Sequence, residues 1–157
     1  MKNNLWQDDD YYRQAPLTDE AVAMAEEIFG VKLPEAYIAI LKEQNGGYIN
    51  YDSFPSSVST SWAEDHVNVD HIFGIAKGSG IMETPYYIQE WELPENIILL
   101  SGDGHSWIAL DYRNQKADPP VIYVDAESEQ IIELAPDFNI FLDGLYVREM
   151  EDGGDVC

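Results

Sequence analysis

The sequence predicts a single α+β domain in which an antiparallel β-sheet packs against several short helices. Residues 97–110 contain two apolar runs on either side of a Gly-Asp-Gly turn, which indicates a central β-hairpin. Residues 17–47 carry two short amphipathic helical patterns, and residues 121–145 carry a second strand pair and a closing helix. The 157 residues suffice for one sizeable core, and the chain shows no internal repeat and no domain linker.

The first predicted helix follows Thr18 and ends at Gly30. Threonine is a good N-cap, and glycine at the other end adopts the left-handed conformation that stops a helix. The apolar face comprises Val22, Ala25 and Phe29. The chain therefore opens with a short helix that needs a core to pack against.

A second helix is predicted to begin with Pro34 at its first position. Its apolar stripe comprises Tyr37, Ile40 and Leu41. Residues 45–47, Asn-Gly-Gly, are expected to end it with a glycine in the left-handed cap.

The middle of the chain is predicted to alternate between strands and loops. Residues 48–54 and 71–76 have strand patterns, whereas residues 62–70 look like an exposed loop. Residues 77–80, Lys-Gly-Ser-Gly, form a turn, and residues 81–91 are predicted to be helical after Pro85.

The C-terminal third supplies the remaining strands and the last helix. The central hairpin is expected to display Asp103 and His105 at its tip. Residues 121–125 form a strand with residues 131–134 as the antiparallel partner, and Pro136 opens the final helix.

We expect three parts in the chain: an N-terminal arm at residues 1–16, the domain at residues 17–147, and an acidic flexible tail at residues 148–157. No apolar stretch approaches the roughly 18–20 residues that span a bilayer, and the first residues contain no apolar signal-peptide segment. The expected location is the cytoplasm.

The charge is the most informative bulk property. There are 8 basic and 30 acidic residues, a formal net charge of −22, and the acids are spread along the chain. Such a surface repels nucleic acid and anionic membranes, and it speeds encounter with a cationic partner. We therefore expect no nucleic-acid and no membrane partner, although solubility alone would also explain an acidic surface.

The chain offers no credible catalytic set, and we expect it not to be an enzyme. His66, His71 and His105 lack metal-ligand spacing, and His71 fits a structural role. His105 beside Asp103 could form an acid–base pair, but a polar turn is the simpler interpretation. Asp125, Glu127 and Glu129 alternate like cation ligands, yet no calcium-loop pattern surrounds them. Cys157 is the sole cysteine, so no cysteine-based metal site is expected, and neither is a cofactor.

Aromatic residues flanked by acids are the candidate partner-binding sites, because such clusters suit contact with a cationic protein. Trp62 is followed by Glu64 and Asp65, and it either anchors a partner or folds back onto the core. A second candidate surface comprises Glu90, Trp91 and Glu92, to which the hairpin tip adds Asp103 and His105.

The ordered combination of motifs resembles the SMI1/KNR4 family, the core of the SUKH superfamily. The motifs are Leu-Thr-Asp-Glu at 17–20, Phe-Gly-Val-Lys-Leu-Pro at 29–34, Asn-Gly-Gly at 45–47, Gly-Asp-Gly at 102–104, Pro-Val-Ile-Tyr-Val-Asp at 120–125 and Leu-Ala-Pro-Asp-Phe at 134–138. The resemblance spans residues 17–145 and implies an antiparallel sheet packed against helices. Phe29 stands where the family often has leucine before the helix-stopping glycine.

The resemblance also implies a function. Small bacterial members are similar to immunity proteins, which neutralise toxin domains, often nucleases. The chain is accordingly expected to bind a cognate protein toxin, a cationic nuclease domain, and to be a monomer or weak homodimer. The alternative is a non-enzymatic regulatory scaffold, as in the larger fungal members.

Overall fold

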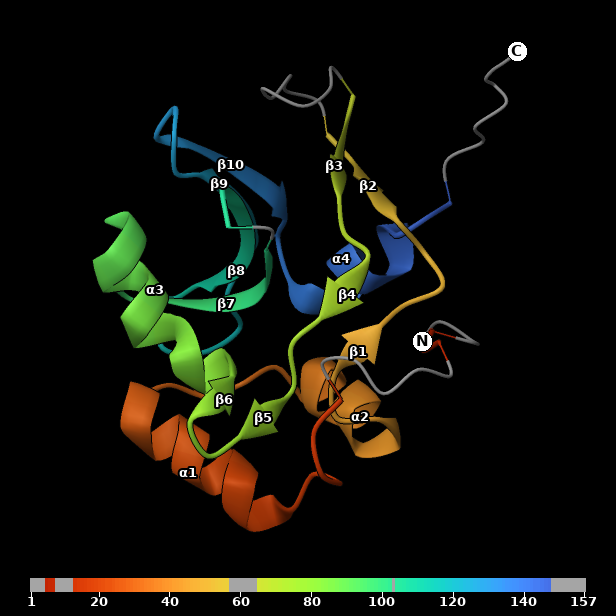
Figure 1. Ribbon diagram of the computed structural model, residues 1–157, viewed down its shortest axis with the longest axis vertical. Coiled ribbons are helices and arrows are strands. Elements are labelled where there is room, and N and C mark those ends of the chain that lie inside the picture. The colour runs from red at the N-terminus through yellow and green to blue at the C-terminus, as the bar shows by residue number, and fades with distance from the viewer. Residues whose placement is uncertain (1–4, 8–12, 57–64, 103, 148–157) are drawn as a thin grey trace.

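A four-stranded antiparallel sheet lies at the centre of the computed structural model, which describes residues 5–7, 13–56, 65–102 and 104–147 (Figure 1). Its strands are β7 (Ile97–Gly102), β8 (Ser106–Asp111), β9 (Val121–Asp125) and β10 (Gln130–Ala135). They lie in the order β10-β9-β8-β7, so each strand pairs with its neighbour in the chain. The predicted central hairpin and the predicted second strand pair are both confirmed.

Strands β7, β8 and β9 are buried on both faces, which explains why they are nearly continuous apolar runs, whereas β10 exposes Ile131 and Glu133. Ile98 and Leu100 of β7 belong to the main core, whereas Ile97 and Leu99 belong to a second cluster on the opposite face. Strand β8 divides in the same way, with Ile108 and Leu110 on one side and Trp107 and Ala109 on the other.

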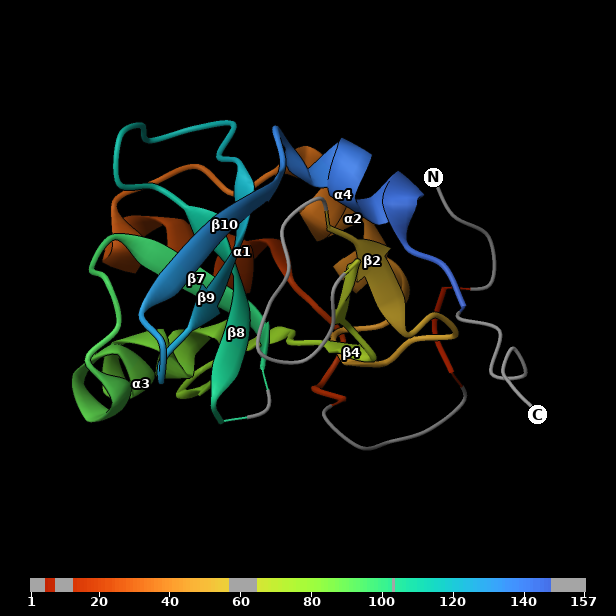
Figure 2. The same cartoon turned by 90° about the horizontal axis from the view of Figure 1, so that it is seen from above.

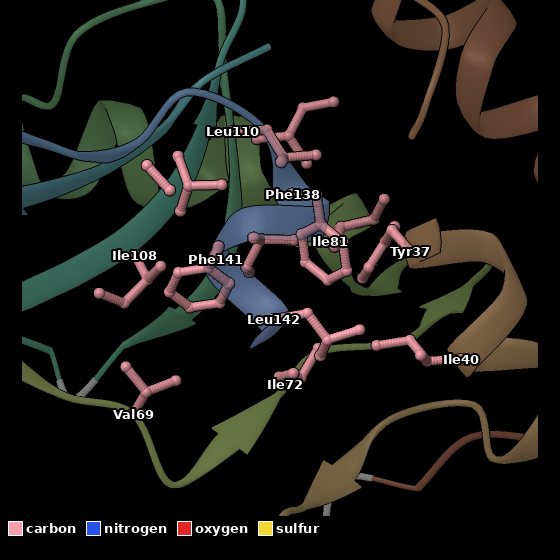
Figure 3. Packing of buried hydrophobic residues seen from close by; sticks show 14 of the residues in the cluster. Tyr37, Ile40, Val69, Ile72, Ile81, Ile108, Leu110, Phe138, Phe141 and Leu142 are labelled. Atoms are coloured by element: carbon pink, nitrogen blue, oxygen red, sulfur yellow. The ribbon is translucent and has the colours of Figure 1, made fainter. Parts of the chain in front are cut away.

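Helices cover the two faces of the sheet. α3 (Thr84–Trp91) lies on one side and supplies Tyr87 and Ile88 to the smaller cluster (Figure 2). α1 (Asp19–Phe29), α2 (Glu35–Glu43) and α4 (Phe138–Gly144) contribute to the main core. The aromatic rings of α4 lie between β8 and α2, with Phe138 edge-to-face against Tyr37 at a centroid distance of 5.5 Å (Figure 3). The α+β single-domain fold is therefore confirmed.

The helix ends follow the local signals with one exception. The Thr18 hydroxyl accepts a hydrogen bond from Ala21 N at 3.1 Å, and Gly30 closes α1 in the left-handed conformation, as predicted. The predicted left-handed glycine cap of α2 is wrong, because Gln44 ends that helix in an extended conformation and Pro34 is its N-cap. The extended turn lets the next residue, Asn45, point into the core.

Asn45 joins three segments of the chain. Its side-chain amide donates to Ala15 O and to Ile75 O, and its Oδ1 accepts from Ile75 N, each at 2.8 Å. It is only 3% exposed, so these bonds satisfy a buried polar group. The helix stop thereby also fixes the residues before α1 and the strand β5 (Ile75–Ala76).

The described part of residues 1–16 packs against the domain. Leu5 is buried in the main core, and Trp6 donates from Nε1 to Ile40 O at 3.0 Å. Trp6 also forms a β-bridge with Ile49. A segment without a periodic hydrophobic pattern can pack in this way because two apolar side chains and one backbone bridge are enough to hold it against the domain.

Residues 48–91 differ most from the sequence prediction. The strand predicted at 48–54 is two short strands, β1 (Gly47–Tyr48) and β2 (Ser53–Pro55), and the strand predicted at 71–76 is β4 (His71–Ile72) and β5. The predicted loop at 62–70 contains a strand, β3 (His66–Asn68), in which Val67 is buried, as is Val69 directly after it. β1 pairs with β4 and β2 with β3, so these strands exist through long-range pairing.

The predicted turn at 77–80 is confirmed as the tip of a hairpin between β5 and β6 (Ser79–Gly80). Gly80 has φ +64°, and a Cβ there would lie 2.0 Å from Gly74 O, so the close approach requires glycine. A 3₁₀ helix, η1 (Ile81–Glu83), then leads into α3, which matches the predicted helical segment. Among the described residues, none of these helices has the length and apolar composition needed to cross a bilayer.

Candidate partner-binding surface

The C-terminal end of α3 presents the acid–aromatic sequence Glu90–Trp91–Glu92 to solvent. Glu92 adopts a left-handed conformation with φ 55° and ends the helix, and Leu93 is buried immediately after it. This sharp reversal leaves Trp91 38% exposed at the last turn, with an exposed carboxylate on each side. The predicted surface residues 90–92 are therefore accessible.

His105, at the tip of the β7–β8 hairpin, lies against Trp91. Their rings meet edge-to-face with centroids 5.9 Å apart. His105 Nδ1 is 3.0 Å from Glu127 Oε2, and the His105 and Glu127 side chains are 60% and 71% exposed. We call Glu90, Trp91, Glu92, His105 and Glu127 the α3-tip surface.

The order of the strands brings Glu127 to this surface. In a sheet of four consecutive antiparallel strands, the β7–β8 and β9–β10 turns lie at the same end. Ala126 N donates to His105 O at 2.9 Å, and the buried Asp125 carboxylate accepts from Glu127 N at 3.0 Å. In the sequence, Glu127 stands out only through its alternation with Asp125 and Glu129, which resembles a set of cation ligands. The meander topology is the signal that would have placed it beside His105.

Negative charge on this surface is not neutralised by basic side chains of the described residues. The ion pairs Lys42–Asp19 and Arg113–Asp111 use other carboxylates. Within the described ranges, Glu90 and Glu92 form no ion pair, and Glu127 pairs only with His105. The surface is therefore suited to basic groups supplied by a partner.

The structure does not bring Asp65 to the α3-tip surface. Asp65 precedes β3, which pairs with β2 on the other side of the sheet from α3 (Figure 1). Its carboxylate lies 2.9 Å from His66 Nδ1 and is 82% exposed. Trp62, Glu64 and Asp103 lie outside the described residues, so the proposed pairing of Asp103 with His105 does too.

The chain matches the model of a known protein family. The SUKH_6 family model, described as SMI1-KNR4 cell-wall, matches residues 19–142. The chain belongs to the SMI1/KNR4 family. No curated protein and no solved structure matches it. The SMI1/KNR4 match runs from the first residue of α1 into α4, and it includes every residue of the α3-tip surface.

SMI1/KNR4 domains of the SUKH superfamily are of the immunity or regulatory type and are generally non-enzymatic. In the described part of this SMI1/KNR4 chain, no group of three or more His, Cys, Asp or Glu side chains is placed to hold a metal ion. The features that stand out at the α3-tip surface are exposed charge and an exposed indole, which are binding features.

His71, one of two buried histidines among the described residues of this SMI1/KNR4 domain, has a structural position. His71 Nδ1 lies 2.7 Å from Asp70 Oδ1, and this hydrogen bond lowers the pKa of the Asp70 carboxyl. Gly102 N donates to His71 Nε2 at 3.4 Å, which links β4 to the end of β7. The predicted structural role of His71 is consistent with these contacts.

Proposed function

We propose that the chain is an immunity protein that binds and neutralises a cognate toxin domain, a basic nuclease, through the α3-tip surface. The observation that carries the proposal is the exposed Trp91 between two glutamates that form no ion pair within the described residues, beside His105 and Glu127, in a chain of the SMI1/KNR4 family. The proposed site of action is the cytoplasm.

Charge gives the mechanism a physical basis. A nuclease cleft is lined with Lys and Arg because it binds phosphates. A chain of net charge −22 is attracted to such a cleft, and carboxylates at the α3 tip can take the positions of phosphates. Trp91 adds the apolar anchor that charge alone lacks, since interface energy concentrates in buried aromatic residues.

The test begins with affinity capture from the native host at about 0.05 M and about 0.5 M salt, which span strong and weak screening. The proposal predicts recovery of a protein with a basic toxin domain, lost at the higher salt. The recombinant domain should then lose its nuclease activity on adding this chain. A captured domain whose activity is unaffected by a saturating amount of the chain would contradict neutralisation.

The alternative is a regulatory scaffold of the same family, which the cell-wall description of the family model favours. A scaffold would retain a non-toxic partner whose binding is insensitive to salt. The capture experiment at two salt concentrations therefore separates the two functions.

A further inference from the structure

A groove of about 750 Å³ lies next to the α3-tip surface, between the end of α1, α3 and the start of β7. Its lining includes the apolar side chains of Phe29, Val31, Ile88, Leu93 and Ile97. Glu92 belongs both to this lining and to the α3-tip surface, so the two features are continuous. We call this feature the α1–α3 groove.

Ile28 makes the groove wall unusual. It is 60% exposed and lines the groove, whereas the stripe of α1 that packs on the core contains Ala25 and Phe29. A single exposed isoleucine has no significance by itself. In a groove whose lining also includes Phe29 and Ile88, however, the exposed Ile28 enlarges the apolar area that a bound side chain would cover.

The groove has charges of opposite sign on its lining. Glu92 and Glu95 lie where α3 leads into β7, and Lys116 comes from the segment between β8 and β9. Both glutamates are exposed and form no ion pair within the described residues. The acidic side is therefore complementary to basic residues along one flank of an apolar ligand.

Part of the backbone edge of β7 is already hydrogen-bonded to other segments, which argues against an added β-strand as the occupant. Leu99 N donates to Thr84 Oγ1 at 3.1 Å. Leu100 O is also used, because it accepts from Phe73 N at 2.7 Å. With these groups of β7 occupied, the groove favours recognition through side chains, as when an amphipathic helix lies in a groove.

We propose that the α1–α3 groove binds an amphipathic helix of the partner, with apolar residues inserted and Lys or Arg facing Glu92 and Glu95. This inference rests on the proposed function and names the partner element that it requires. The 8 residues of α3 extend ~12 Å, so roughly two turns of the bound helix lie along it.

The first test uses a peptide probe and the full chain, so it does not depend on the toxin. The probe is an amidated peptide of about 16 residues with a leucine stripe at helical spacing and lysines along one flank. A peptide of the same composition in shuffled order is the control. We expect the striped peptide to shift the amide NMR signals of Ile28, Gln89 and Ile97. Equal shifts with both peptides, or none with either, would overturn the proposal.

A matched pair of variants tests the site itself. Ile28→Ser removes the groove isoleucine, and Ile140→Ser removes an isoleucine of α4 that is 49% exposed and lies outside the groove lining. The dissociation constant of the striped peptide should rise at least about tenfold for Ile28→Ser and stay unchanged for Ile140→Ser. Equal affinities for the two variants would overturn the proposal.

Binding of the captured toxin domain by two variants distinguishes a wrong groove assignment from a wrong proposed function. Loss of toxin binding by Trp91→Ala, with full binding by Ile28→Ser, would leave the function intact and remove the groove helix. Sedimentation would reveal another occupant: a wild-type dimer dissociated by Ile28→Ser would assign the groove to a second copy. The proposal predicts a wild-type monomer, consistent with repulsion between chains of net charge −22.

Discussion

Trp91 and His105 meet edge-to-face with ring centroids 5.9 Å apart, although one ends a helix and the other caps a hairpin. Their contact joins the last turn of α3 to the tip of the β7–β8 hairpin. It holds an exposed indole in place among carboxylates, so little side-chain freedom is lost on binding. That arrangement favours affinity for a basic partner.

Trp91→Ala should weaken toxin binding about 10- to 100-fold, because a tryptophan that becomes buried near the centre of an interface contributes a large share of the binding free energy. Because Trp91 is only 38% exposed, the truncation also removes buried apolar area, and the free energy of unfolding should fall by about 2 kcal/mol. Titration calorimetry and urea unfolding measure the two effects. Ile140→Ala, a truncation on α4, is the control and should leave affinity unchanged.

Charge at the α3 tip should act mainly on the rate of association. Replacing Glu90 and Glu92 by Gln is expected to lower the association rate constant by about threefold or more at low salt, with a smaller effect at high salt. The matched control replaces Glu35 and Glu43 of α2, which are also exposed, by Gln. Equal losses in both double variants would show that only net charge matters, not this surface.

The Asp111–Arg113 ion pair should make stability depend on acidic pH. Burial raises the pKa of Asp111, but hydrogen bonds from Arg113 Nε and Nη2, at 2.9 and 3.0 Å, outweigh it and the pKa is lowered. A lowered folded pKa means that the contribution is complete above the unfolded value of about 3.9 and is lost as the pH falls through the folded value.

Asp111→Asn should therefore lower the free energy of unfolding by about 1–2 kcal/mol at neutral pH, with the difference from wild type shrinking below about pH 4. Urea unfolding at several pH values measures it. Asp143→Asn, an exposed change on α4, is the control for the general effect of one charge. A difference that stays constant down to strong acid would contradict the role assigned to the ion pair.

Asn45→Asp should be strongly destabilising. The substitution keeps the acceptor for Ile75 N but removes the donor to Ala15 O and Ile75 O, and it places a carboxylate beside those oxygens. We expect a loss of about 3 kcal/mol in the free energy of unfolding, typical of buried unpaired groups. Asn139→Asp on the exposed face of α4 should have little effect, and similar values for both variants would refute the network.

The parts of the fold that sequence predicted are those set by local signals. Thr18 caps the start of α1 and Gly30 ends the helix, as these residue types commonly do. The strands of the four-stranded sheet are long enough to show their apolar pattern. The strand prediction for residues 48–54 and 71–76 was wrong in its bounds because the strands have only two or three residues. They form by pairing between distant residues, such as Gly47 with Ile72. Pairs of that kind leave little local periodicity.

The residues of the candidate surface also fall into two groups, those that the sequence identifies and those that only the fold brings together. Glu90, Trp91 and Glu92 are consecutive, so composition alone identified them. Glu127 joins them only through the meander, and the α1–α3 groove exists only because Phe29 and Ile88 come together from separate helices. Neither relationship can be inferred from a local window of residues.

Hydrogen exchange of the complex with the captured toxin domain would locate the binding surface on this chain. We expect slower exchange at residues 88–93, 104–106 and 126–129, and at residues 28–31 if the helix occupies the groove, with no change in the exposed residues of α2. Protection confined to β2 and β3, with these segments unchanged, would contradict the assignment of the α3-tip surface as the binding site.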